Sequence, residues 1–449
     1  MGLVVLAPLP FGLVHSLTQA FLACVVMALV LGYCRVKIKQ GRGPDVNLKR
    51  IWPETLGFFL VLGWGVLQIS TITPQAWHHP LWAEAAAVLG TDVRSSISLA
   101  RGDGFESLIR VLTYGAVFFL ALQLGRNRKK AELILWSIVL ASTGYAVYGI
   151  ISHFSGQDMV LWVEQTEASK SLSGTFINRN NFATYLGLGL ICSAGLYLEN
   201  FLKVIDSFGR GRDRALQLMQ QVFVRGAPLL ACVLILLTAL FLTQSRGGVT
   251  STLTALLILI VFMGLLIRLT SRAYQFLVVC LVGAVLSVFF LSGEGWLDRL
   301  TATDLERETR MLRYEQTWKA VNQAPWTGYG IGSYEQTFFM FADERTATSY
   351  KAHNDWLEMM FELGLPGAFL WFALLGGLGM RCLFGFFRRR RDHVYPMAGF
   401  SVCVLVGLHS LADFSLQIPA VAVTFAVLLG VGVAQAWSSL DIDGSEQGL

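Results

Sequence analysis

The sequence has few charged side chains. Only 14% of its 449 residues are Asp, Glu, Lys or Arg, whereas soluble domains contain about 25%. Hydrophobic residues make up 54% of the chain, so most side chains must face lipid or pack inside a helical bundle. This composition excludes an ordinary soluble domain and predicts a polytopic membrane protein.

Paired metal-binding and disulfide patterns are also missing. The seven cysteines lie in or beside apolar runs, and none forms a Cys-x-x-Cys pair. A disulfide framework or zinc site is therefore not expected, and the cysteines are interpreted as small packing residues. No internal repeat or second domain is visible, so we expect residues 1–449 to form one integral membrane domain.

Apolar runs dominate what is present. A spanning helix needs about 20 apolar residues, and an N-terminal stub with Pro8, Pro10 and Gly12 is too short to span alone. Candidate spans lie near 12–34, 52–72, 105–125, 131–152, 179–202, 227–243, 248–267, 273–292, 359–384, 394–412 and 417–437. The fold class predicted is an all-α transmembrane bundle, with eleven spans plus the stub and about twelve in all.

Charge predicts the orientation of these spans. Basic residues cluster in alternate connections, near residues 35–50, 126–130, 203–225, 268–272 and 381–391. The positive-inside rule places those connections in the cytoplasm. The opposite side then receives residues 73–104 and 153–178, a tight turn at 244–248, and a long loop at 293–355 with amphipathic helices.

Three features on that opposite side carry candidate chemistry, and Arg246 is the first. The segment Thr243-Gln244-Ser245-Arg246-Gly247-Gly248 joins two apolar runs with almost no loop. An arginine at the membrane boundary costs free energy unless it reaches headgroups or an anion. The two readings are snorkelling and a phosphate clamp, the latter with glycines that let a substrate approach the backbone.

The second feature is an amphipathic helix expected over Leu305–Gln323. Its apolar face is formed by Met311, Tyr314, Trp318 and Val321. At 100° per residue, Arg310 lies at the margin of that face, whereas Arg313 points towards solvent. Arg310 is therefore the candidate ligand, with packing of its stem on apolar surface as the alternative, and Arg313 is a possible support.

The third feature is His353, just before a spanning helix. Asp355 and Glu358 fit a capping box, which places His353 at the helix entrance. A neutral imidazole there can accept a proton at neutral pH; the alternative is a polar interface residue.

The glycine-rich segment Gly328-Tyr329-Gly330-Ile331-Gly332 lacks the Lys-Ser/Thr of a phosphate-binding loop and is interpreted as a tight turn.

Arg246, Arg310 and His353 come from distant parts of the chain, yet the topology places them on one side. Two guanidinium groups and a neutral base suit attack of a hydroxyl on a sugar carbon whose leaving group is a diphosphate. The guanidinium groups would supply the charge that a divalent metal supplies elsewhere. No paired-carboxylate motif lies on this side, so neither a metal nor another cofactor is expected.

At these residues the sequence resembles the O-antigen ligase and O-antigen polymerase superfamily. The motifs are residues 174–183 (GTFINRNNFA) and Ser245-Arg246-Gly247-Gly248. Arg310 with Tyr314, followed by Pro325 and the glycine turn, is similar to the loop of that family, which often has Leu or Trp where Tyr314 stands. His353-Asn354, nine residues, then Gly364-Leu365-Pro366-Gly367 matches the ligase pattern.

The resemblance implies a metal-independent, inverting glycosyltransferase with the membrane fold of the C-type enzymes. The donor would be an undecaprenyl-diphosphate-linked glycan at the periplasmic face of a bacterial inner membrane, and no nucleic acid is involved. Carried over, His353 is the base or acceptor-positioning residue, and Arg246 and Arg310 are diphosphate ligands. Possible supporting residues are Arg313, Arg179, Asn354 and Asn178.

Three functions stay open at this point. A ligase transfers the chain to lipid A–core, whereas a polymerase transfers it to another lipid-linked glycan; the His353 motif favours the ligase. A transporter of lipid-linked glycans would instead have ionisable residues along a midplane path and often internal repeats. The spans have apolar centres and no repeat, which argues against transport.

Overall fold

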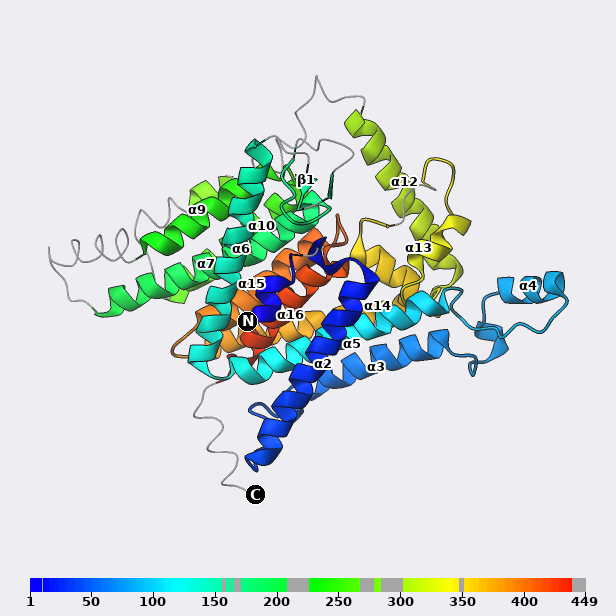
Figure 1. The fold of residues 1–449 in the computed structure, drawn as a ribbon, viewed down its shortest axis with the longest axis horizontal. Coiled ribbons are helices and arrows are strands. Elements are labelled where there is room, and N and C mark those ends of the chain that lie inside the picture. Colours follow the sequence, from blue (N-terminus) through cyan, green and yellow to red (C-terminus); the bar gives the residue numbers. More distant parts are fainter. Residues whose placement is uncertain are drawn as a thin grey trace.

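The computed structural model describes residues 1–9, 11–155, 159–161, 163–164, 171–207, 226–266, 278–283, 302–346 and 351–437. Regular structure in these ranges is helical (Figure 1), apart from a short hairpin of β1 (Met159–Val160) and β2 (Val163–Glu164). The all-α class is thus confirmed for the described residues. Most of the expected span at 273–292 and parts of the 293–355 loop lie outside them.

The helices follow the apolar runs closely. They are α1 (Gly2–Leu6), α2 (Ser16–Lys39), α3 (Trp52–Ile69), α4 (Leu81–Leu89), α5 (Arg101–Gly125), α6 (Arg128–Phe154), α7 (Arg179–Ser207), α9 (Ala227–Leu242), α10 (Arg246–Leu266), α12 (Ala302–Gln323), α13 (Tyr334–Thr337), α14 (Asp355–Arg388), α15 (Val394–His409) and α16 (Pro419–Ala434). Short 3-10 turns are η1 (Phe11–Leu13), η2 (Leu48–Ile51), η3 (Gln75–Trp77), η5 (Phe338–Met340) and η6 (Ser415–Gln417).

Membrane-spanning potential is spread over most of these helices. Within the described residues, six helices are long and apolar enough to cross a membrane, namely α2, α5, α6, α7, α10 and α14. Three further apolar helices, α9, α15 and α16, are shorter. The chain is therefore a helical protein with several candidate spans, and the count of about twelve stays a prediction.

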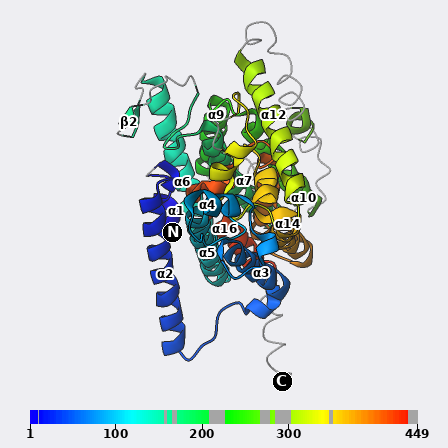
Figure 2. The same ribbon diagram turned by 90° about the vertical axis from the view of Figure 1, so that its right-hand side faces the viewer.

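The core of the bundle lies around α16 and α7. Every residue of α16 is buried, and α16 packs against α5 and α15. In α7, Gly187 and Gly189 lie directly against Thr252 of α10 and Ser142 of α6, because small residues let helix backbones approach closely. By contrast α2 runs along the outside of the bundle (Figure 2), with only 11% of its apolar window buried.

Arginines from three separate connections gather at one end of the bundle. Arg126 donates to the backbone oxygens of Ala434 and Trp437, at 3.2 and 2.9 Å, and Arg389 donates to the Trp437 oxygen at 3.3 Å. The Arg50 guanidinium lies 5.8 Å from the centre of the Trp437 ring. These arginines, which come from separate basic connections, define the arginine end. His353 lies just before the start of α14 and Arg389 just after its end, so His353 marks the opposite, site end.

Candidate active site

His353 is held from three directions. Its Nδ1 lies 3.3 Å from Oδ1 of Asp413, whose side chain is fully buried. The Tyr314 hydroxyl of α12 donates to the His353 carbonyl at 2.9 Å, and the Phe414 ring meets the imidazole edge-on. Because a carboxylate only accepts, the hydrogen belongs on Nδ1, and Nε2 keeps its lone pair. This arrangement allows His353 to act as a general base through Nε2.

The backbone of His353 is itself unusual. Its φ of 53° is in the left-handed region, which glycine and asparagine adopt more readily than other residues. The turn ends at Asn354, whose Oδ1 accepts from the backbone N–H groups of Trp356 and Leu357. The expected capping box of Asp355 and Glu358 is thus wrong by one residue: Asn354 is the cap, since its short amide reaches the free N–H groups.

Asp355 and Glu358 have other partners. Asp355 is buried and accepts from Ser410 Oγ at 2.9 Å and from Gln417 Nε2 at 3.1 Å. Glu358 accepts from the backbone N–H of Ala352. These bonds fix the first turn of α14 against the end of α15 and the segment after it.

Arg246 is the first residue of α10. Ser245 caps this helix, because its Oγ accepts from the Gly248 N–H at 3.2 Å. For Gly248, which is buried, the expectation of a backbone open to a substrate is wrong. A Cβ on Gly248 would stand 2.5 Å from that of Ala183, and one on Gly247 would stand 3.1 Å from His409 Cδ2. The glycines serve helix packing, which sets Gly247, the residue after the exposed Arg246, against His409.

A buried polar cluster connects this turn to His353. Thr184 Oγ1 lies 2.5 Å from His409 Nδ1 and 2.8 Å from Ser415 Oγ. Ser415 Oγ is 3.1 Å from Asn181 Oδ1 and 3.3 Å from Asp413 Oδ2. The cluster therefore runs from α7, through the last turn of α15, to the carboxylate beside His353.

The helix α12 confirms a helix at the expected segment, but the predicted apolar face is wrong. Met311 and Trp318 are 62% and 46% exposed, whereas Arg313 is only 7% exposed and donates to the Lys351 carbonyl at 3.3 Å. Arg310 is half-buried. The assignment of Arg313 to solvent was therefore wrong, because the helix packs on the chain before His353 through the Arg313 and Thr317 side.

Arg310 nevertheless lies near the site. Burial raises the pKa of the Tyr314 phenol, an effect that Arg310 opposes and the Asp413 carboxylate increases. The phenol stays protonated at neutral pH and can donate to His353. The start of α10 thus lies against His409 at the end of α15, and α12 reaches His353 through Tyr314.

The glycine-rich segment is a tight turn, as predicted. Gly328, Gly330 and Gly332 all have positive φ, and Gly328 lies directly against the backbone of Glu362 and Gly364. Gly364 also has a positive φ of 71° and interrupts α14. The nine residues between Asn354 and Gly364 therefore form the first part of α14. This part ends at Gly364, where the glycine turn packs against the helix.

Gln68 of α3 fastens the same turn. Its Nε2 donates to the carbonyls of Thr327 and Glu362, both at 2.8 Å, and its Oε1 accepts from the Ile331 N–H at 3.0 Å. Tyr329 stacks on Phe361 with ring centres 4.5 Å apart, and both are buried. Tyr329 is thus a core residue.

The supporting residues have separate places. Asn178 accepts from the Asn180 N–H at 2.8 Å at the start of α7, and Arg179 follows it in an exposed position. Asn178 and Asn354 thus act as helix caps. The sequence did not single out Asn181 or Thr184 as site residues, although their spacing puts both on one face of α7.

These elements define a helical membrane protein with a polar site at one end of its bundle. Residues 231–372 match the family model described as O-antigen ligase. This match covers the motifs from Ser245 onwards and supports the O-antigen ligase and polymerase superfamily, in which the general activity is of ligase or polymerase type; the motif at 174–183 lies outside it. Arg246, Arg310 and His353 lie inside the matched segment, and Asp413 lies outside it. A comparison with curated proteins found no match.

Proposed function

We propose that the protein transfers a glycan from undecaprenyl diphosphate to an acceptor hydroxyl at the periplasmic face of a bacterial inner membrane. The observation that carries this proposal is a histidine that is paired with a buried carboxylate and contacted by α12. The buried polar cluster connects this pair to His409, which lies beside the turn that starts α10. Lipid A–core is the preferred acceptor, because the His353 motif has the ligase pattern.

The transfer is an in-line displacement. His353 takes the proton of the acceptor hydroxyl, whose oxygen bonds to the anomeric carbon while the bond from that carbon to the diphosphate oxygen breaks. Undecaprenyl diphosphate leaves with the electron pair, and Arg246 and Arg310 stabilise its growing charge. Inversion follows from attack on the face opposite the leaving group. Two guanidinium groups do the work that a metal ion does elsewhere, which makes the reaction metal-independent.

A deletion strain distinguishes ligase from polymerase. With a ligase removed, full-length glycan should accumulate on the lipid carrier while the core stays uncapped. With a polymerase removed, single repeat units should appear on the core instead. Electrophoresis of lipopolysaccharide, together with analysis of the lipid-linked glycan, reads both outcomes. A strain with unchanged glycans on both lipids contradicts the proposal.

Asp413 should act as a positioning residue for His353. In Asp413→Asn the amide can present its N–H instead of a carboxylate oxygen to Nδ1, which favours the wrong tautomer. We expect kcat to fall by about 10²-fold or more, since general-base catalysis contributes about 10²–10⁴-fold, while the KM for the donor stays within a few-fold. Steady-state kinetics on purified protein measure both.

The control for this variant is Asp413→Glu, which keeps a carboxylate and should restore part of kcat. A purely structural role predicts a different result. In that case Asn and Glu lower the yield and melting temperature alike, and kcat per folded molecule stays the same.

A further inference from the structure

The buried polar cluster contains a chain of hydrogen bonds that leads from His353 into the bundle. Its members, Asp413, Ser415, Thr184 and His409, are each 2% exposed or less. Asp413 and Ser415 follow α15, His409 is the last residue of that helix, and Thr184 belongs to α7. Buried polar groups cost free energy unless they are hydrogen-bonded, so the hydrogens of these side chains should point at one another.

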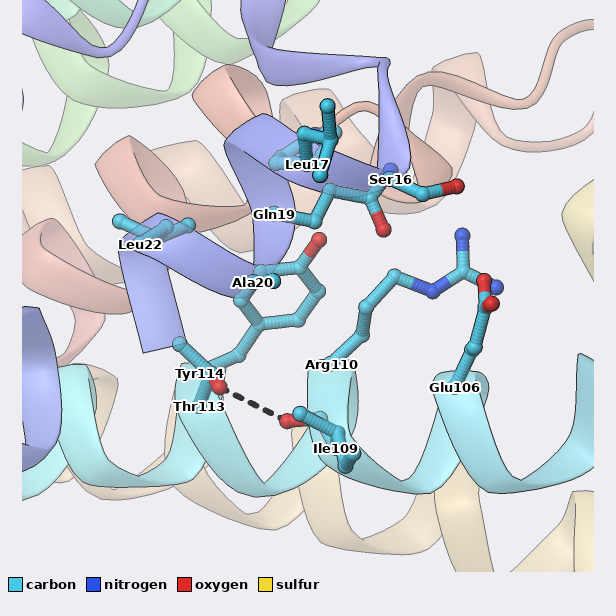
Figure 3. A pocket seen from close by; sticks show the side chains of 11 residues that line it. Ser16, Leu17, Gln19, Ala20, Leu22, Glu106, Ile109, Arg110, Thr113 and Tyr114 are labelled. Carbon is cyan, nitrogen blue, oxygen red and sulfur yellow. Dashed lines mark hydrogen bonds between the residues drawn. The ribbon is translucent and has the colours of Figure 1, made fainter. Parts of the chain in front are cut away.

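The chain lies away from two cavities beside α5, since its four members line neither of them. The first, of about 250 Å³, lies between α2 and α5, where Figure 3 shows Arg110 and Tyr114 of α5 together with Ser16 and Gln19 of α2. The second is a wider groove along α3, α5 and α14. The hydrogen bonds of the chain can therefore be assigned from the protein groups alone.

Asp413 fixes the direction of the first bond. Its carboxylate only accepts, and its Oδ2 lies 3.3 Å from Ser415 Oγ. The Ser415 hydroxyl has a second acceptor, Asn181 Oδ1, at 3.1 Å. Hydrogen bonds to a charged acceptor are about twice as strong as those between neutral groups, and Asp413 is fully buried. The Ser415 hydrogen is therefore assigned to Asp413.

The next two bonds follow from the number of hydrogens. Thr184 Oγ1 lies 2.8 Å from Ser415 Oγ, closer than the 3.1 Å to its other acceptor, the Asn180 carbonyl. Because Ser415 gives its only hydrogen to Asp413, Thr184 donates in this contact. Thr184 then has no hydrogen left for His409 Nδ1, which is 2.5 Å away, so His409 donates from Nδ1. All bonds of the chain thus run from His409 towards Asp413.

The surroundings of His409 agree with this tautomer. A Cβ on Gly247 would lie 3.3 Å from His409 Nε2, so Nε2 is close to the first turn of α10. The start of a helix carries partial positive charge, which favours a lone pair over an N–H hydrogen at that place. His409 therefore has its hydrogen on Nδ1, as His353 does.

We propose that Ser415, Thr184 and His409 are positioning residues, which direct a chain of hydrogen bonds to the Asp413 carboxylate and thereby weaken its attraction for the proton of His353. The assignment rests on the proposed function, in which His353 has to be neutral to act as a base. A carboxylate that accepts an additional hydrogen bond attracts its other partner less strongly, because the first donor already stabilises its charge. Without the chain, His353 should keep its proton to a higher pH.

Other titratable groups around the two histidines stay in place in this test. Among the described residues they are Arg310, Arg313 and Tyr314 of α12, Lys351 before His353, Asp355 and Glu358 of α14, and Arg246 at the start of α10. The variants below change none of them, so a change in the protonation of His353 reports on the chain.

The protonation of His353 can be measured without turnover. Diethyl pyrocarbonate modifies neutral imidazole, and mass spectrometry of the full-length protein, treated in nanodiscs, identifies the peptide that carries His353. The modification rate against pH gives the midpoint at which this histidine becomes neutral. In Ser415→Ala the midpoint should rise by about one pH unit, tenfold in proton affinity, because Asp413 loses a hydrogen bond to its charged group.

Thr184→Val removes the next hydroxyl and keeps the shape of the side chain. The midpoint should rise by less, about threefold in proton affinity, because Ser415 still donates to Asp413 but loses the bond that polarises it. Thr184→Ser keeps the hydroxyl and should restore the wild-type midpoint. Ser193→Ala is the matched control on α7, since Ser193 is equally buried and donates to the Leu190 carbonyl of its own helix.

Two variants of His409 test the far end of the chain. His409→Leu has no hydrogen to donate and should raise the midpoint in the same direction as Thr184→Val. His409→Asn can present an amide N–H in place of Nδ1, so its midpoint should stay closer to that of the wild-type protein.

The rate of glycan transfer provides a second measurement. In Ser415→Ala the rate lost at low pH should return at higher pH, where His353 becomes neutral again. An unchanged or lowered midpoint in Ser415→Ala overturns the proposal. A lower yield and melting temperature with the wild-type midpoint also overturns it, because that result indicates a packing role. If the midpoint rises but the wild-type protein transfers no glycan, the chain is supported and only the proposed function fails.

Discussion

Replacing His353 is expected to reduce transfer by about 10²–10⁴-fold, the usual contribution of a positioned general base. The variant needs care, because φ at this residue is 53° and alanine is strained there. His353→Asn removes the imidazole while keeping a residue that tolerates the left-handed conformation. Both His353→Ala and His353→Asn should therefore lose activity, measured as initial rates on purified, folded protein.

The control is His393→Ala. His393 lies near the arginine end, where its Nδ1 is 2.9 Å from the Phe386 carbonyl, and its loss should leave the rate nearly unchanged. If His353→Asn retains activity while His353→Ala does not, the histidine has a conformational role and the assignment of the base is wrong.

Arg246 should give the second large effect. Removing one preorganised donor from a developing anion costs about 10²–10³-fold in rate, so Arg246→Ala should lower kcat by that factor. Arg246→Lys keeps the charge but loses the planar pair of donors that matches phosphate oxygens. Its kcat should lie between that of the wild-type protein and that of Arg246→Ala. Single-turnover assays with a fluorescent lipid-linked glycan measure the chemical step.

Arg246 directly precedes the tightly packed Gly247 and Gly248, so the folding of both variants must be checked. The arginine side chain can change without altering the backbone, so both variants should melt within a few degrees of the wild-type protein. Arg391→Ala, an exposed arginine just after α14, provides the charge control. Equal loss of activity in Arg391→Ala and Arg246→Ala would remove the case for a diphosphate clamp.

The length of the apolar runs explains why the helical fold class could be predicted from the sequence. Each apolar run that the structure describes in full coincides with a helix, because each span must satisfy its own backbone hydrogen bonds. The ends proved harder. The expected cap was Asp355, but Asn354 occupies that position, since either short polar side chain can cap and only the chain path decides between them.

The site was predicted less completely for a similar reason. Arg246 and His353 stand out in the sequence because charged or titratable groups at membrane edges are costly. Thr184 and Ser415 are ordinary small polar residues, and only tertiary packing shows that they meet His409. The helical wheel misplaced Arg313 because it assumed that Met311 and Trp318 mark the buried face, whereas the buried side of α12 is set by its contacts with the chain before His353.

The amide of Gln68 also limits how this region can vary. One side chain satisfies two carbonyl acceptors and one N–H donor that belong to different segments. Glutamate at this position has no hydrogen to donate and would set a carboxylate against two carbonyl oxygens, and a shorter asparagine would not span the gap. A change of a single atom, from nitrogen to oxygen, would therefore unfasten the glycine turn from α3 and loosen the frame on which α12 and α14 are aligned.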